Sequence, residues 1–408
     1  MVLNLLSKVT GARSNRSLWR ITGDTRPKQI RTAKNAEEQK AGGNGGRGTP
    51  GDRQPKDKLA SPDTHHTGPA HSASEHVRRY LIVYTILSVI IALPVGYYSE
   101  GFTTVNSRFF SNLVIFFAIL TVYPSMVQLR SEGLAKTFKS WRPILASLIY
   151  VFLFSPIIAF TLAPTLGSNE IGIGFVAANV VPASSASLGY VLIAGGSIEL
   201  ATALAVLSLV VAIPAIPFFL SIYGGQVSSA VPVLPIMTSV LYILVLPFLA
   251  GQLTRYVVLK KKGPLLINKT IRPCYLSLTT MLSMFALIFV LVDKEAALII
   301  TKPQIVGEII GYQSAIIVGI LIVSMLVSKA MHLSYEDHQA VAFISVTKNQ
   351  SVAAAIATLD LSPAAALPLA IIPMIQPVIA IIYIHLERPV RKLFALPEKA
   401  LLTVSADK

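Results

Sequence analysis

Ten apolar stretches follow one another between residues 80 and 386, and each is long enough to cross about 30 Å of hydrocarbon as a helix. Over the whole chain 53% of the residues are hydrophobic and 13% are charged, whereas soluble domains carry about 25% charged residues. The pattern therefore predicts an all-α polytopic membrane protein with ten transmembrane helices. The expected spans are residues 80–98, 109–127, 143–163, 171–194, 200–222, 231–253, 273–293, 304–328, 338–359 and 363–386.

The basic residues between the spans predict how the chain is oriented. Links that follow even-numbered spans are rich in Lys and Arg, namely Arg130, Lys136, Lys139, Arg142, Arg255, Lys260, Lys261, Lys262, Lys269, Arg272 and Lys329. The links on the other side carry Arg108, Lys294 and Lys302. Because basic links stay on the cytoplasmic side, both termini are expected in the cytoplasm, with the protein in a cell (inner) membrane.

The two ends of the chain differ from the region between them. Residues 1–79 are rich in Lys, Arg, Ser and Gly and contain no apolar stretch of span length, which predicts a disordered basic cytoplasmic tail near anionic lipid. Residues 1–36 contain eight Lys or Arg and one acid, so an organellar transit peptide, and hence an organellar membrane, is the alternative. Residues 387–408 are expected to form a cytoplasmic C-terminal tail.

The ten spans divide into two sets of five, residues 80–222 and 231–386. Because five is odd, the second set would enter the membrane in the opposite sense, which gives two inverted five-helix repeats. The fourth span of each set is interrupted, in the first set by Pro182, which removes a backbone donor and favours a break. The polar residues around this proline are Asn179, Ser184, Ser185 and Ser187. Paired breaks predict a transport site, because freed backbone groups must line a cavity; a packed, kinked span is the alternative.

The ninth span carries a polar run at its centre, made of Thr347, Lys348, Asn349, Gln350 and Ser351. A lysine at mid-membrane costs about 2.5–3.5 kcal/mol on insertion scales, so Lys348 indicates a protein or water-filled environment. Its ammonium could neutralise an anionic substrate, replace a transported cation, lose a proton when desolvated, or bridge backbone carbonyls at the helix break. Gln376, between two prolines of the tenth span, is expected at a similar depth.

The sequence offers no chemistry typical of an enzyme. It contains no nucleophile–base pair, phosphate-binding loop or metal-ligand spacing, so no catalytic residue, metal site or cofactor is expected. The single cysteine, Cys274, excludes a disulfide framework. Most basic residues outside the first tail lie at the ends of spans, which argues against nucleic-acid binding. His332, His338 and His385 flank spans and are expected at the membrane interface.

Two segments carry a resemblance to a known family. The run from Gly174-Phe175 to Pro182-Ala183-Ser184-Ser185-Ala186-Ser187 is similar to a Pro-Gly-Gly-Thr-Ala-Ser-Asn segment of the bile acid:sodium symporter family, and Lys348–Ala353 is similar to its Gln-Asn-Ser segment. The resemblance covers roughly residues 80–392 and extends to the arsenite-efflux permeases of the same superfamily. It implies that helices 4 and 9 are broken and cross at mid-membrane, near sodium sites and beside the substrate cavity. It also implies a panel domain of spans 1, 2, 6 and 7, and a core domain of the other six.

Departures from the family pattern argue against sodium coupling. The glutamate that precedes the ninth-span crossing in sodium-coupled members corresponds here to Ile344 or Ser345, and the asparagine that closes the fourth-span motif corresponds to Ser187 or Leu188. Lys348 adds a positive charge where a cation would bind. Arsenite is not expected either, because the fourth span has no cysteine and Gln376 replaces the tenth-span acid of the permeases.

The expected function is secondary active transport of a small organic anion by alternating access. The expected substrate- or ion-binding residues are Asn179, Ser184, Ser185, Ser187, Thr347, Lys348, Asn349, Gln350, Ser351 and Gln376. The first alternative is an organic anion symporter coupled to sodium, and the second is a membrane sensor or scaffold that does not transport. The expected partners are a small anionic substrate and membrane lipid, without nucleic acid, and the sequence leaves monomer and homodimer open.

Overall fold

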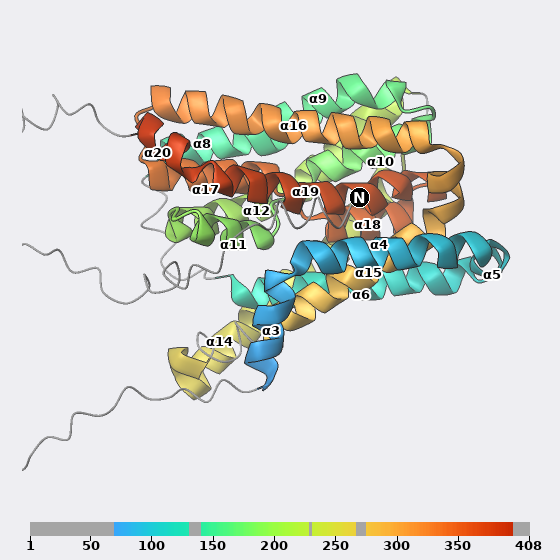
Figure 1. Cartoon of the computed structure of the whole chain (residues 1–408), viewed down its shortest axis with the longest axis horizontal. Coiled ribbons are helices and arrows are strands. Elements are labelled where there is room, and N and C mark those ends of the chain that lie inside the picture. The colour runs from blue at the N-terminus through green and yellow to red at the C-terminus, as the bar shows by residue number, and fades with distance from the viewer. Residues whose placement is uncertain (1–68, 130–139, 228–230, 267–274, 395–408) are drawn as a thin grey trace, which may run out of the picture. The chain divides into compact units, whose positions relative to one another are not determined.

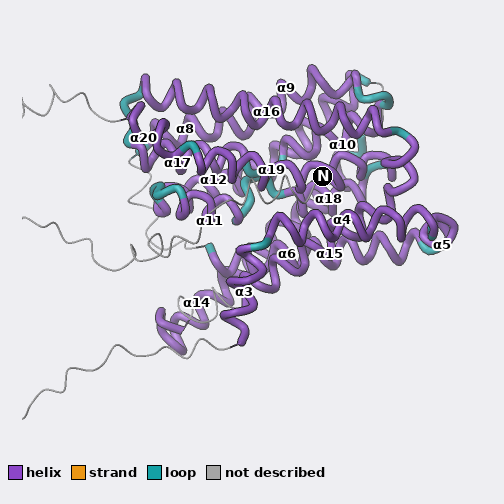
Figure 2. Tube along the Cα trace, viewed as in Figure 1, coloured by secondary structure: helices purple, strands orange, loops and turns teal. Residues whose placement is uncertain are grey.

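The computed structural model describes residues 69–129, 140–227, 231–266 and 275–394, all within one compact unit of residues 66–408. Helices dominate these four ranges, and no strand occurs in them (Figure 2). The first half contains α3 (Pro69–Arg79), α4 (Leu81–Tyr98), α5 (Glu100–Val105), α6 (Ser107–Gln128), α8 (Trp141–Ile149), the π-helical turn η1 (Tyr150–Phe154), α9 (Ser155–Leu162), the 3-10 turn η2 (Ala163–Thr165), α10 (Asn169–Val180), α11 (Ala186–Ile193) and α12 (Ile198–Gln226). The second half contains α13 (Val233–Val240), the π-helical turn η3 (Leu241–Val245), α14 (Leu246–Leu266), α15 (Ser277–Thr301), α16 (Pro303–Ala330), α17 (Tyr335–Val346), α18 (Gln350–Asp360), the 3-10 turn η5 (Pro363–Ala366), α19 (Leu367–His385) and α20 (Glu387–Phe394).

Seven helical stretches of the described chain are long and apolar enough to cross a membrane. They are Leu81–Tyr98, Ser107–Gln128, Trp141–Thr165, Ile198–Gln226, Val233–Lys261, Pro303–Ala330 and Pro363–His385. The other three expected spans fall on the interrupted pairs α10/α11 and α17/α18 and on α15, which carries three charged residues in its second half. The prediction of an all-α polytopic membrane protein is confirmed.

The described parts of the two expected tails contain helices that the sequence did not indicate. Within the expected disordered tail, Pro69–Arg79 forms α3, which packs against α15, so tertiary contact supports a helix that composition did not indicate. Within the expected C-terminal tail, Glu387–Phe394 forms the amphipathic helix α20, which packs against α17 and α19. Residues 1–68, 395–408 and Cys274 lie outside the described residues.

The seventh span is also displaced from its expected range, because α15 continues to Thr301. Asp293 and Glu295 therefore lie inside a helix and are buried, and Lys294, expected in an outer link, donates to Ser111 Oγ at 3.2 Å. Gly96 of α4 allows this close packing: a Cβ at that position would lie 2.2 Å from the carbonyl oxygen of Asp293.

The helices form two groups that meet along one boundary. In the panel group, α15 packs against α4 and α6, and α14 packs against α6; α13 and η3 precede α14 in the same span (Figure 1). In the core group, α8–η1–α9, α10, α11, α12, α16, α17, α18 and α19 pack against one another. Contacts of α18 with α6 and α13, and of α19 with α15, join the two groups. The four spans of the panel group are the ones that the family resemblance assigns to a panel domain.

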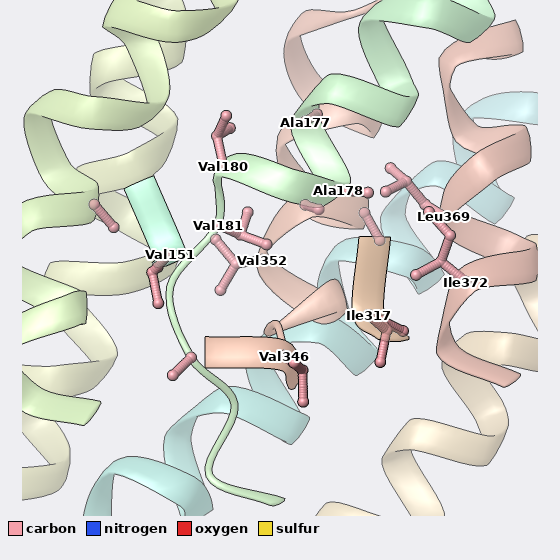
Figure 3. Close-up of a cluster of buried hydrophobic side chains, with 14 of the residues drawn as sticks. Val151, Ala177, Ala178, Val180, Val181, Ile317, Val346, Val352, Leu369 and Ile372 are labelled. Carbon is pink, nitrogen blue, oxygen red and sulfur yellow. The ribbon is translucent and has the colours of Figure 1, made fainter. Parts of the chain in front are cut away.

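The two interrupted spans lie in the apolar interior of the core group. Figure 3 shows Val180 and Val181, where α10 ends, in one apolar cluster with Val346 at the end of α17, Val352 of α18 and Val151 of η1. At Gly174 of α10, a Cβ would lie 2.0 Å from the carbonyl oxygen of Ala365 in η5, so only glycine permits this approach. The breaks are therefore surrounded by closely packed protein.

Candidate functional site

Two interrupted spans cross each other at their breaks. The first runs from α10 through residues 181–185 to α11, and the second from α17 through residues 347–349 to α18. Ala183 and Lys348 form an isolated antiparallel bridge, in which the Ser184 N–H donates to the Thr347 carbonyl and the Asn349 N–H donates to the Pro182 carbonyl, each at 2.8 Å. The crossing is thus made by backbone hydrogen bonds between segments more than 160 residues apart in the chain.

Local sequence explains where α10 ends. Pro182 cannot donate a backbone hydrogen bond and disfavours helical geometry in the residue before it. Val181 accordingly adopts an extended conformation, with φ −72° and ψ 156°. At the second break, Thr347 is also extended, with φ −97° and ψ 95°, although no proline is present. The second break therefore depends on contacts made by the polar run.

Those contacts come from side chains of neighbouring helices. The Lys348 N–H donates to Gln376 Oε1 of α19 at 2.7 Å, and the Ala183 N–H donates to Ser208 Oγ of α12 at 3.1 Å. Gln350 Nε2 donates to the Ala178 carbonyl in the last turn of α10 at 3.1 Å. Since a buried backbone group without a partner is costly, these amides and hydroxyls stabilise the two breaks inside the protein.

Lys348 is buried, with 3% of its surface exposed. Its Nζ donates to the Val151 carbonyl of η1 at 2.7 Å and lies 5.8 Å from the centre of the Phe152 ring. The ion pairs found between described residues, Arg391 with Glu336 and Arg391 with Glu387, do not involve Lys348. The crossing therefore contains an ammonium that a carbonyl and an aromatic ring contact, without a neutralising carboxylate in the described part of the chain.

Some polar atoms at the crossing have no partner. Thr347 Oγ1 and Gln350 Oε1 are both buried and lack a hydrogen-bond partner. Buried polar atoms are normally paired, so such exceptions require an explanation, and a ligand is one. Ser184 and Ser185 are half-buried at the same crossing.

Asn179, in the last turn of α10, belongs to a second polar cluster. Its Nδ2 donates to Gln313 Oε1 of α16 at 3.0 Å, and its Oδ1 accepts from Ser155 Oγ of α9 at 3.0 Å. Ser155 and Gln313 were not among the expected site residues. A glutamine inside the apolar span 304–328 is the signal that could have indicated Gln313.

The structure thus distributes the ten expected site residues over several roles. Eight lie at the crossing or directly after it: Ser184, Ser185, Ser187, Thr347, Lys348, Asn349, Gln350 and Ser351. The Ser187 hydroxyl donates to the Ser184 carbonyl, so it serves the local turn. Gln376 contacts the crossing from α19, and Asn179 contacts α9 and α16. Within the described residues, no group of three His, Cys, Asp or Glu side chains is arranged to hold a metal ion.

His338 does not lie at an interface as expected, because it is fully buried. Its Nδ1 pairs with Ser328 Oγ at 3.1 Å and its Nε2 with Tyr383 Oη at 2.8 Å. Phe394 of α20 stacks on the imidazole, with the ring centres 4.7 Å apart and the planes 17° from parallel. The helix α20, which the sequence did not indicate, covers this histidine.

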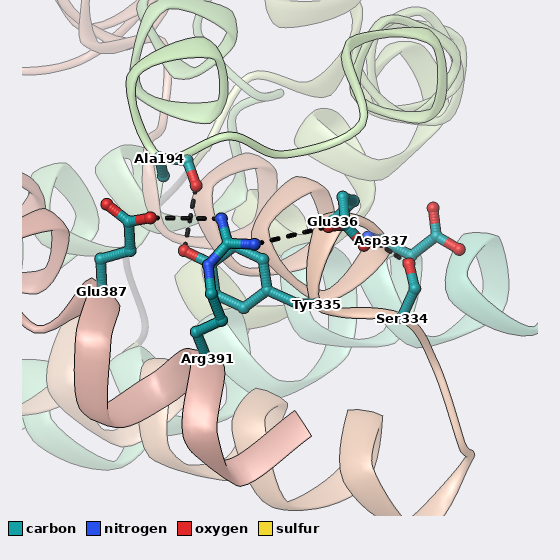
Figure 4. Close-up of polar contacts among 7 residues, drawn as sticks. All are labelled: Ala194, Ser334, Tyr335, Glu336, Asp337, Glu387 and Arg391. Carbon is teal, nitrogen blue, oxygen red and sulfur yellow. Dashed lines mark hydrogen bonds and ion pairs between the residues drawn. The ribbon is translucent and has the colours of Figure 1, made fainter. Parts of the chain in front are cut away.

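Figure 4 shows the polar contacts of α20 at the same end of α17. Arg391 forms ion pairs with Glu336 at 3.8 Å and Glu387 at 3.2 Å, and its guanidinium lies 4.1 Å from the centre of the Tyr335 ring. Tyr335 Oη donates to the carbonyl of Ala194, directly after α11, at 2.9 Å. One cluster therefore links α20 to the start of α17 and to the end of α11, which are the ends of the two broken spans that lie away from the crossing.

Comparison with known protein families gives a match over part of the chain. The model of the sodium bile acid symporter family matches residues 114–302, which begin in α6, include the first break and end after α15. The comparison with curated proteins gives no match. Residues 114–302, somewhat less than half of the chain, are thus similar to the sodium bile acid symporter family, whose members are transporters, and the apolar helices of the described residues are those of an integral membrane protein.

Proposed function

We propose that the protein is a secondary active transporter of a small organic anion and that it works by alternating access. Ten spans in two inverted five-helix repeats, residues 80–222 and 231–386, underlie this proposal. The antiparallel crossing of α10/α11 with α17/α18 supports such a repeat, because each break occupies the fourth span of its set.

We propose an anionic substrate because the ammonium of Lys348 is buried and has no carboxylate partner among the described residues. A buried charge is costly unless it is paired, and an anionic substrate in the transport cavity would lower this cost. The unpartnered oxygens of Thr347 and Gln350 offer further groups to a ligand at the same crossing. Ser184, Ser185, Asn349 and Ser351 complete the proposed set of substrate- or ion-binding residues.

The boundary between the two helix groups supports movement of one group against the other. The second break lies directly before α18, and α18 contacts α6 and α13 of the panel group. A substrate bound beside the crossing would therefore lie near this boundary. Rocking of the core group against the panel group would expose it to each side of the membrane in turn.

Sodium coupling is the runner-up, and the family match is the observation that favours it. Against it stand Ile344 or Ser345 in place of a glutamate, and the positive charge of Lys348. We propose that transport does not use the sodium sites usual in the family.

Uptake of labelled carboxylates into proteoliposomes tests the proposal. We expect uptake by the wild type to differ by less than about twofold between sodium and choline gradients. Lys348→Ala should lower uptake at least about tenfold, the equivalent of about 1.4 kcal/mol. Lys302→Ala, at an exposed lysine beside a helix end, is the matched control and should leave uptake unchanged.

Two results would contradict the proposal in different ways. Equal uptake by Lys348→Ala and the wild type would remove Lys348 from the transport site. A sodium gradient that stimulates uptake tenfold or more would favour the sodium symporter.

A further inference from the structure

The Lys348 side chain lies on a defined side of the crossing. Its neighbours in the chain are non-helical: Thr347 has φ −97° and ψ 95°, and Asn349 has φ −83° and ψ 84°. Lys348 contacts η1, and η1 packs against α10, α12, α16 and α17, all of the core group. The ammonium is therefore directed toward η1, inside the core group.

The surroundings of the ammonium are those that favour a small cation. Both α10 and α17 end at the crossing, with a partial negative charge at their C-terminal ends, and α11 and α18 begin there, with a partial positive charge at their N-terminal ends, so the helix ends contribute charges of both signs. Lys348 is the second residue after the end of α17. The groups that contact the ammonium itself, the Val151 carbonyl and the face of the Phe152 ring, both attract cations. In transporters with broken helices, helix C-termini and unwound carbonyls are the groups that bind monovalent cations.

We infer that the Lys348 ammonium is the resident cation of this crossing: a charge attached to the chain occupies the place that a diffusible monovalent cation would need. The inference deepens the proposed transport function, since a built-in positive charge would make a bound cation unnecessary at this position. It has a structural consequence that does not depend on transport. Removal of the side chain leaves the Val151 carbonyl and the Phe152 ring without a cation, in a space that a small cation can enter.

Thermal unfolding of the purified full-length protein tests this inference at constant ionic strength in chloride salts of sodium, methylammonium or choline. The wild type should melt at the same temperature in all three salts. Lys348→Ala should melt several degrees lower in choline and recover in sodium or methylammonium. A gain of about 5 °C is expected at a hundredfold excess of cation over its Kd, since a ligand that binds the folded state stabilises it. Choline should give no recovery, because it is too large for the space of a lysine ammonium.

Two control variants separate a specific site from a general salt effect. Lys348→Met keeps most of the side-chain volume without the charge, so it should be destabilised and show no recovery with any cation. Lys302→Ala removes an exposed lysine and should behave like the wild type in every salt.

The inference is overturned if sodium selectively stabilises the wild type, a measurement that needs no variant. It is also overturned if Lys348→Ala responds equally to choline and sodium, if Lys348→Met recovers as well as Lys348→Ala, or if Lys348→Ala stays unfolded in all three salts. Because this experiment measures stability, a Lys348→Ala protein that no cation stabilises would overturn the inference without affecting the proposal that the wild type takes up anions. Conversely, if the wild type takes up no carboxylate, the effect of cations on the melting temperature of Lys348→Ala can still be interpreted.

Discussion

At the scale of single residues, the crossing depends on polar side chains that contact the backbone. Gln376 accepts the Lys348 N–H, Ser208 accepts the Ala183 N–H, and Gln350 donates to the Ala178 carbonyl. A helical span normally pairs these backbone groups within itself, and each break leaves some of them to other helices. The side-chain amides in the apolar spans therefore stabilise the crossing by pairing with backbone groups, whether or not they also contact a substrate.

Gln376→Leu is predicted to destabilise the protein by about 1–3 kcal/mol, because it leaves the buried Lys348 N–H without an acceptor. Denaturant or thermal unfolding of the purified protein measures the change. Gln304→Leu is the matched control, since Gln304 is exposed and its side chain contacts Glu308 one turn away, and it should alter stability by less than about 0.5 kcal/mol. Equal effects of the two substitutions would show that the Gln376 contact contributes nothing specific.

At the scale of elements, α10 is a buried helix that ends at the crossing. Every residue from Ile171 to Val180 is buried, and the helix contacts α12, α19, η5 and α18. Its position against η5 depends on Gly174, where a side chain would meet the backbone of Ala365. Because η5 continues directly into α19, which carries Gln376, a shift at Gly174 would reach the crossing itself.

Gly174→Ala is predicted to destabilise the protein by about 1–3 kcal/mol, because the new methyl group would force η5 away from α10. Gly311→Ala in α16 is the matched control: no atom lies within 4 Å of its added Cβ, so it should be neutral or stabilising by up to about 1 kcal/mol. Thermal unfolding of both variants distinguishes the two cases. If Gly174→Ala were as stable as the wild type, η5 could move away from α10 without a loss of stability.

At the scale of the whole molecule, the described chain has a panel group and a core group, with the crossing inside the core group near the boundary between them. The proposed movement of one group against the other would involve the boundary next to the crossing, where α18 contacts α6 and α13 of the panel group. α3 packs against α15, so it belongs with the panel group rather than with the tail that precedes it.

Deletion of residues 1–68, which keeps α3 intact, is predicted to leave carboxylate uptake within about twofold of the full-length protein, because the crossing and both helix groups remain. Uptake into proteoliposomes and the melting temperature should be measured together. Loss of function with an unchanged melting temperature would instead favour a sensor or scaffold whose basic tail binds a partner.

The amino-acid sequence by itself determined the elements. Long apolar stretches indicate membrane helices, and Pro182 and the polar run at 347–351 indicate the two breaks, because apolar length, a missing backbone donor and a buried charge are local properties. The antiparallel bridge between the breaks, by contrast, follows only from how the helices pack.

Only the tertiary structure decided which groups meet. The Lys348 ammonium contacts a carbonyl 197 residues away, Gln376 accepts a backbone N–H 28 residues away, and α20 buries His338 under Phe394. Such contacts depend on the packing of distant helices, and helical periodicity alone does not specify the partner of a buried polar group. The sequence therefore identified Lys348 as a costly residue, and the fold decided that its charge lies against the carbonyl of a π-helical turn inside the core group.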